Sequence, residues 1–173
     1  MRRVLVVGNT GAGKTTMAAA LAARLGVPHV EMDALFWEPG WVQSELAVFR
    51  ARVDEATGGD GWTACGNYSR AVDITWPRAD TVVWLDLPVA LSVWRVIVRT
   101  VRRRIRREQL WGTNHEKISD LFKLNDESLV YFALKHGRRK RAQIAERIAA
   151  HPHVTVHHLR SRRDVRRFLA GLS

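Results

Sequence analysis

The segment that decides the fold lies near the start of the chain and reads Val4-Leu5-Val6-Val7-Gly8-Asn9-Thr10-Gly11-Ala12-Gly13-Lys14-Thr15. Its first four residues are apolar and mostly β-branched, which is typical of a central parallel strand buried on both faces. The alanine-rich segment 15–25 that follows favours a helix, which ends at Gly26 with Pro28 just beyond it. The sequence therefore predicts a strand, a glycine-rich turn and a helix in direct succession.

The glycine-rich turn satisfies the phosphate-binding pattern G-x-x-x-x-G-K-[ST] of a P-loop. Its glycines let backbone N–H groups turn toward a β-phosphate, and the positive end of the next helix dipole adds to the attraction. In such a loop Lys14 supplies charge to the β- and γ-phosphates, and the Thr15 hydroxyl binds magnesium (Mg2+). We expect a nucleoside triphosphate, ATP, to contact Gly8, Asn9, Thr10, Gly11, Ala12, Gly13, Lys14, Thr15 and Thr16.

The rest of the chain alternates between apolar runs and helical patterns. Further strands are expected at 29–32, 62–65, 81–86 and 154–159, with helices at 43–57 and 89–108 among the connections. Such alternation predicts an α/β sheet that is largely parallel. We find no internal repeat or linker, so we expect a single domain over residues 1–173, with residues 95–141 as an insertion.

Composition narrows the classes of function. The chain has 28 Lys and Arg against 17 Asp and Glu, and its net charge of +11 favours a polyanionic partner, which nucleotide phosphates and nucleic acid both satisfy. No apolar run approaches the roughly 20 residues of a membrane span, and no signal peptide is evident, so a cytoplasmic protein is expected. Cys65 is the single cysteine, which excludes an internal disulfide.

Five further segments carry a family resemblance: EMDALFW at 31–37, GNYSR at 66–70, WPRAD at 76–80, VVWLDLP at 82–88, and the arginine-rich segment after Trp94. With the P-loop, they make the chain resemble the small nucleoside and metabolite kinases typified by adenylate kinase and shikimate kinase. Within that group it is most similar to the adenylate-kinase-like proteins labelled DNA topology modulation proteins. The resemblance implies a P-loop NTPase fold with a five-stranded parallel sheet in order 2-3-1-4-5, and an arginine-bearing lid that closes over ATP.

The resemblance also implies an acceptor site over the ends of the second and third strands. Asp33 would hold the acceptor hydroxyl or a magnesium-bound water there, although a helix-cap or turn aspartate is the alternative. Trp37 and Trp41 could wall the acceptor pocket. The loop after the third strand would contribute Gly66, Asn67 and Tyr68, and Arg70 lies near the position where similar kinases bind the acceptor phosphate.

Two positions depart from the family pattern or leave alternatives open. Adenylate kinases carry an aspartate immediately before the glycine that corresponds to Gly66, whereas this chain has Cys65, which moves the expected metal-side carboxylate to Asp33. Asp86 ends an apolar run, so it is either a magnesium-side aspartate or a cap at the start of the next helix.

The predicted helix 89–108 is amphipathic. One face carries Arg95, Arg99, Arg102, Arg103 and Arg106, and an apolar stripe is formed by Trp94, Ile97, Val98, Val101 and Ile105. By resemblance, Arg99 would bind the nucleotide, and Arg103 and Arg106 would stabilise the transferring phosphoryl group. The alternative is a solvated basic face or a nucleic-acid contact. Arg138, Arg139, Lys140 and Arg141 could contribute from the far side of the insertion.

The function expected from these residues is an ATP-dependent phosphotransferase that moves the γ-phosphoryl of Mg-ATP to a nucleotide or small metabolite. Lys14, Asp33, Arg103 and Arg106 would be catalytic, with magnesium on Thr15 and, through water, on Asp33. The chain lacks the threonine-glycine-aspartate segment by which adenylate kinases seat AMP, so the acceptor stays open. An ATP-binding regulatory or DNA-binding protein is the alternative from another class.

Overall fold

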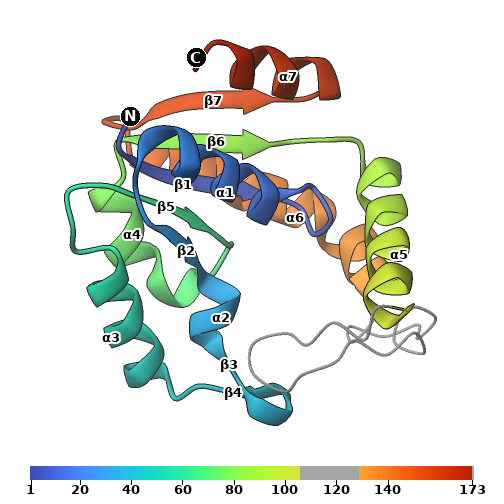
Figure 1. The fold of residues 1–173 in the computed structure, drawn as a ribbon, viewed down its shortest axis with the longest axis horizontal. Helices are drawn as coiled ribbons and strands as arrows, with labels where there is room; N and C mark the ends of the chain where they lie inside the picture. Colours follow the sequence, from blue (N-terminus) through green and yellow to red (C-terminus); the bar gives the residue numbers. More distant parts are fainter. Residues whose placement is uncertain (106–128, 173) are drawn as a thin grey trace.

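The computed structural model describes residues 1–105 and 129–172. Its centre is a five-stranded parallel sheet in the order β2-β5-β1-β6-β7 (Figure 1). The strands are β1 (Arg3–Gly8), β2 (His29–Glu31), β5 (Trp62–Cys65), β6 (Thr81–Leu85) and β7 (Thr155–Leu159). This is the predicted order 2-3-1-4-5, because two short strands outside the sheet take the intervening numbers. The predicted fold class is confirmed.

Helices cover both faces of the sheet. They are α1 (Lys14–Leu25), α2 (Met32–Phe36), α3 (Leu46–Ala56), α4 (Val72–Arg78), α5 (Val89–Ile105), α6 (Leu129–Ala150) and α7 (Arg162–Ala170). The side chains of β1 alternate between two cores: Val4 and Val6 lie with residues of α1 and α7, whereas Leu5 and Val7 lie with residues of α4 and α6. No helix in the described part of the chain is long and apolar enough to cross a membrane.

The region after β2 differs from the prediction. The strand ends at Glu31, and Asp33 lies in the first turn of α2 instead of at a strand end. A two-stranded antiparallel ladder of β3 (Trp37–Glu38) and β4 (Val42–Gln43) follows, so the helix expected to begin at residue 43 begins at Leu46. Strands of two residues carry no periodic pattern, and the sequence therefore gave no signal for this ladder.

Helix α5 places its apolar stripe on the outside. Trp94 is 63% exposed and Ile105 is 76% exposed, and Val98 and Val101 are exposed with them. The buried face is formed by Ser92, Val96 and Thr100, which recur every four residues. The helix is amphipathic as predicted, but its buried side is set by contact with the P-loop and not by its largest apolar residues.

Candidate functional site

The P-loop runs from the end of β1 to the start of α1, and its glycines are required by space as well as by conformation. Gly8 has φ +149° and Gly11 has φ +77°. A Cβ on Gly8 would lie 2.4 Å from the Leu85 carbonyl oxygen, and one on Gly11 would lie 2.2 Å from that of Ser92. Strand β6 and helix α5 therefore close on the loop so tightly that only glycine fits.

This packing predicts a specific cost for Gly11→Ala. We expect the free energy of unfolding to fall by roughly 1–3 kcal/mol more than in Gly40→Ala, because overpacking against α5 adds to the backbone strain. Gly40 is a matched control, since its φ is also +77° but nothing lies within 4 Å of an added Cβ. Urea denaturation of both variants measures the difference. Equal losses would show that α5 does not press on the loop.

Lys14 begins α1 and folds back over the loop. Its Nζ donates a hydrogen bond of 3.0 Å to the carbonyl oxygen of Asn9. Burial lowers the pKa of Lys14, whereas the nearby charge of Asp33 raises it and that of Arg99 lowers it. The charges of Asp33 on α2 and Arg99 on α5 therefore both act on this lysine.

The Thr15 hydroxyl, the predicted magnesium ligand, lies among oxygen and sulfur side chains. It donates to Glu31 Oε1 at 3.3 Å and accepts from Cys65 Sγ at 3.7 Å, and His29 Nε2 lies 3.6 Å from that sulfur. Burial raises the pKa of Cys65 to about 11, so the thiol is neutral at neutral pH. Glu31 is thus the carboxylate in contact with Thr15.

Asp33 and Tyr68, both predicted on the acceptor side, are in direct contact. The Tyr68 hydroxyl donates a 2.5 Å hydrogen bond to Asp33 Oδ1. Burial raises the pKa of Tyr68 and the Asp33 carboxylate raises it further, so the phenol remains a donor. The Tyr68 ring packs on Phe36 and Phe49, with centroids 4.8 and 5.2 Å away. A buried aromatic cluster therefore fixes the phenol that orients Asp33.

The loop after β5 is joined to the P-loop. Asn67 Nδ2 donates a 2.6 Å hydrogen bond to the Gly8 carbonyl oxygen, and the Gly8 N–H points to Asn67 Oδ1 at 3.4 Å. Gly66 has φ +145°, and a Cβ there would lie 3.0 Å from Met32 Cβ, which is closer than ordinary van der Waals contact. The sequence predicted both residues for the acceptor side, but gave no signal that the Asn67 amide would bridge two strand ends.

Aromatic residues surround the acceptor side. The Trp37 ring packs edge-on against the rings of Phe36 and Trp41, with centroids 5.1 and 5.5 Å away. The Arg70 guanidinium lies over the Phe36 ring, 5.7 Å from its centroid. The structure thus brings Trp37, Tyr68 and Arg70 around one phenylalanine that belongs to the same short helix as Asp33.

Helices α5 and α6 bring further cations to the P-loop. Arg95 Nη1 donates to the Ala12 carbonyl oxygen at 3.0 Å, and Arg99 lies close enough to Lys14 to lower its pKa. Arg103 is partly buried on the same helix. Arg106, a predicted catalytic residue, lies outside the described residues.

Lys140 reaches the same site from α6. One turn earlier, a Cβ on Gly137 would lie 3.2 Å from Asn9 Nδ2, so the helix passes close to the P-loop. The pKa of Lys140 is lowered to about 8, chiefly by burial and also by the charge of Lys14, while Asp33 opposes the shift. Lys140 is therefore a second lysine near Lys14 and Asp33. The sequence offered it only as one of four neighbouring cations.

Asp86 does not cap the next helix, which was one of the two alternatives that the sequence suggested. Helix α5 begins at Val89, so Asp86 lies too early to cap it. Its carboxylate is 14% exposed, pairs with Arg141 Nη2 at 2.7 Å, and contacts His158 Nε2 at 2.9 Å. These contacts tie the end of β6 to α6 and β7.

The strand order and the P-loop define a P-loop NTPase fold of kinase-like architecture. Residues 4–61 match the ATPase family associated with various cellular activities (AAA). Over 54 residues the chain is 43% identical to an adenylate kinase of Mycobacterium sp. (strain MCS). That match covers 31% of this chain and 30% of the relative, so it spans less than a third of either protein.

Two solved shikimate kinases are similar in structure. The enzyme from Bacteroides thetaiotaomicron has a TM-score of 0.51 at 19% identity, over 99% of this chain and 96% of its own. The enzyme from Acinetobacter baumannii, solved in complex with shikimate, has a TM-score of 0.56 at 20% identity, over 99% and 90%. At these identities the likeness shows the fold.

Proposed function

We propose that this protein is an ATP-dependent phosphotransferase that moves the γ-phosphoryl group of Mg-ATP to a nucleotide or a small metabolite. The observation that supports the proposal is the geometry of the P-loop, where Lys14 Nζ donates to the Asn9 carbonyl oxygen and the neighbouring Thr15 hydroxyl donates to Glu31 Oε1. The charge of Asp33 acts on the pKa of the same lysine. Kinases use a lysine for the phosphates and, where the acceptor is a hydroxyl, a carboxylate that takes its proton.

On the nucleotide side, the loop from Gly8 to Thr16 holds the phosphates with its backbone N–H groups, and Lys14 leaves the Asn9 carbonyl oxygen to bind the β- and γ-phosphates. Arg99, Arg103 and Lys140 add positive charge from α5 and α6, where negative charge is spread in the transition state. Arg106 belongs to the same proposal by its spacing in the sequence.

A magnesium ion fits the donors beside Lys14. Thr15 offers a hydroxyl oxygen and Glu31 a carboxylate at 3.3 Å from it, and Asp33 follows two residues later. Magnesium prefers such oxygen ligands, together with substrate phosphates and water, and it would neutralise the β- and γ-oxygens. Because the neutral thiol of Cys65 cannot replace a carboxylate, we assign Thr15 to the metal and Glu31 or Asp33 to its bound water.

On the acceptor side, Asp33 receives the proton of the acceptor hydroxyl while Tyr68 holds the carboxylate in place. Trp37 lines this side, and the backbone at Gly66 and Asn67 and the guanidinium of Arg70 provide polar contacts to the acceptor. An anionic group on the acceptor would suit Arg70.

The pKa of Lys140 predicts a pH dependence of binding. Lys140 is positive below pH 8 and neutral above it, so Mg-ATP affinity should fall by up to about tenfold per unit as the pH rises from about 8 toward 9.5. Fluorescence titration across this range measures the effect, and Lys140→Met should bind more weakly at pH 7.5 and lose most of the dependence. If Mg-ATP affinity depended on pH as steeply in Lys140→Met as in the native protein, Lys140 would not belong to the phosphate site.

Protein stability should respond in the opposite direction, because the unfolded lysine titrates at 10.5 and binds more protons than the folded one between pH 8 and that value. The free energy of unfolding should therefore rise with pH in this window in the native protein, and rise less in Lys140→Met. This sign distinguishes a depressed lysine pKa from general alkaline denaturation.

The proposed function is tested by ADP production from Mg-ATP across a panel of nucleoside monophosphates, nucleosides and hydroxylated metabolites. Lys14→Ala serves as the blank. A signal that depends on one acceptor and disappears in the variant would support the phosphotransferase and name its substrate class. ATP binding without any acceptor-dependent signal would favour the regulatory or nucleic-acid alternative.

A further inference from the structure

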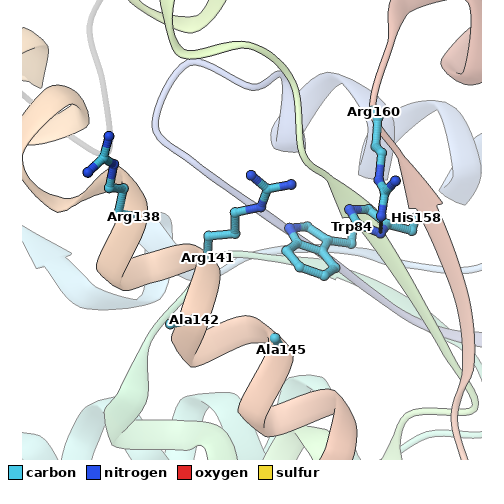
Figure 2. Close-up of a pocket in the computed structure, with 7 residues that line it drawn as sticks. All are labelled: Trp84, Arg138, Arg141, Ala142, Ala145, His158 and Arg160. Carbon is cyan, nitrogen blue, oxygen red and sulfur yellow. Dashed lines mark hydrogen bonds between the residues drawn. The ribbon is translucent and has the colours of Figure 1, made fainter.

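A second cavity lies away from the P-loop, between α6 and the strands β6 and β7 (Figure 2). Its volume is about 540 Å³, within the range of pockets that hold small molecules. Three arginines line it: Arg138 and Arg141 come from α6, and Arg160 directly follows β7. In Figure 2 Arg141 and Arg160 extend toward the Trp84–His158 pair, whereas Arg138 points away from it. None of the P-loop residues lines it.

The residue spacing along α6 explains why this helix contacts both the P-loop and the cavity. Arg138, Arg141, Ala142 and Ala145 recur at intervals of three and four residues and line the cavity. Gly137 and Ile144 lie on another side of the helix, where Gly137 approaches the P-loop and Ile144 enters the core. Because the side chains of Ala142 and Ala145 are small, they leave space between the arginines and the sheet.

The floor of the cavity is formed by two stacked rings. Trp84 and His158 are register partners on neighbouring strands, and their rings stack with centroids 4.0 Å apart and an interplanar angle of 2°. Arg160 Nη2 lies 3.4 Å from His158 Nδ1, and His158 Nε2 lies 2.9 Å from Asp86 Oδ2. Because a guanidinium only donates, Arg160 donates to His158 Nδ1, and Nε2 is left to donate to Asp86.

The charges around the cavity are unequal. Asp86 pairs with Arg141, and it is the one carboxylate that forms an ion pair with a lining arginine in the described part of the chain. Arg138 and Arg160 therefore add positive charge that no acidic side chain offsets there. Arg141 is 60% exposed, so it can turn from Asp86 toward a ligand at little cost.

We propose that this cavity binds a small phosphorylated molecule through Arg138, Arg141 and Arg160. Guanidinium groups present parallel N–H donors that match the oxygens of a phosphate, and three of them around one opening suit an ion with more than one negative charge. The Trp84–His158 stack forms an apolar floor beneath the molecule. His158 holds Arg160 in position before the ligand arrives, whereas Arg141 turns toward the ligand from Asp86.

Inorganic pyrophosphate is a suitable probe, and isothermal titration calorimetry of Lys14→Ala measures it with the P-loop site impaired. We expect binding at one site per chain. Adding Arg138→Gln and Arg160→Gln should weaken it by about tenfold or more, because each change removes charge-assisted hydrogen bonds. Both side chains are exposed, so the thermal midpoint should stay unchanged.

The matched control adds Arg163→Gln and Arg166→Gln instead, which removes the same charge from exposed positions on α7 that do not line the cavity. Its affinity should stay within about twofold of that of Lys14→Ala, as expected for a screened, distant charge. Undetectable pyrophosphate binding in Lys14→Ala would overturn the proposal. So would equal weakening in the two arginine pairs, which would show a general charge effect.

Discussion

Lys14→Ala is expected to abolish acceptor-dependent ADP production almost completely. The Lys14 ammonium is the charge that the P-loop directs at the β- and γ-phosphates. Lys14 is the first residue of α1, directly after the glycine-rich turn. Loss of one preorganised transition-state donor lowers turnover by roughly 100- to 1,000-fold, and loss of a charged hydrogen bond weakens ATP binding by about tenfold or more. Steady-state kinetics and ATP titration measure the two effects.

The control for this variant is Arg24→Ala, which removes a positive charge from the exposed end of the same helix. It should leave turnover and ATP affinity nearly unchanged. If Lys14→Ala kept more than a tenth of the native turnover, the P-loop would not be the site of phosphoryl transfer.

Asp33→Asn is expected to separate catalysis from nucleotide binding. The amide keeps an oxygen that accepts the Tyr68 hydrogen bond but cannot take a proton from the acceptor. Turnover should fall by roughly 100- to 10,000-fold, as for loss of a general base, while ATP affinity changes by less than about threefold. Kinetics at saturating ATP measure turnover, and a binding titration measures ATP affinity.

Tyr68→Phe is the companion variant, because it removes the hydroxyl that orients Asp33 and keeps the ring among Phe36 and Phe49. It should lower turnover less than Asp33→Asn does. Normal turnover in Asp33→Asn would show that the acceptor-side carboxylate has been misassigned.

Local patterns predicted most of the sheet because its strands are continuous apolar runs. Residues 4–7, 62–65 and 81–85 are fully buried in the structure, and each run had been read as a strand. The strand order came from the family resemblance, since periodicity alone does not state which strands are neighbours. It is confirmed by the register of β1 between β5 and β6.

The contacts within the candidate site could not be predicted in the same way. The bridge from Asn67 to Gly8 and the approach of Lys140 to Lys14 join residues far apart in the chain, and neither leaves a periodic signal. The orientation of α5 depends on Gly11, which leaves room for Ser92 and turns the larger apolar residues outward. Such tertiary contacts override the pattern of a single helix.

The central claim is that the γ-phosphoryl group passes to an acceptor and not to water. With ATP labelled with ³²P at the γ-position, the account predicts that the label appears on the acceptor found by the panel, in equal amount to the ADP formed, and that both signals are lost in Lys14→Ala. Label released only as inorganic phosphate, at a rate independent of every acceptor, would contradict it.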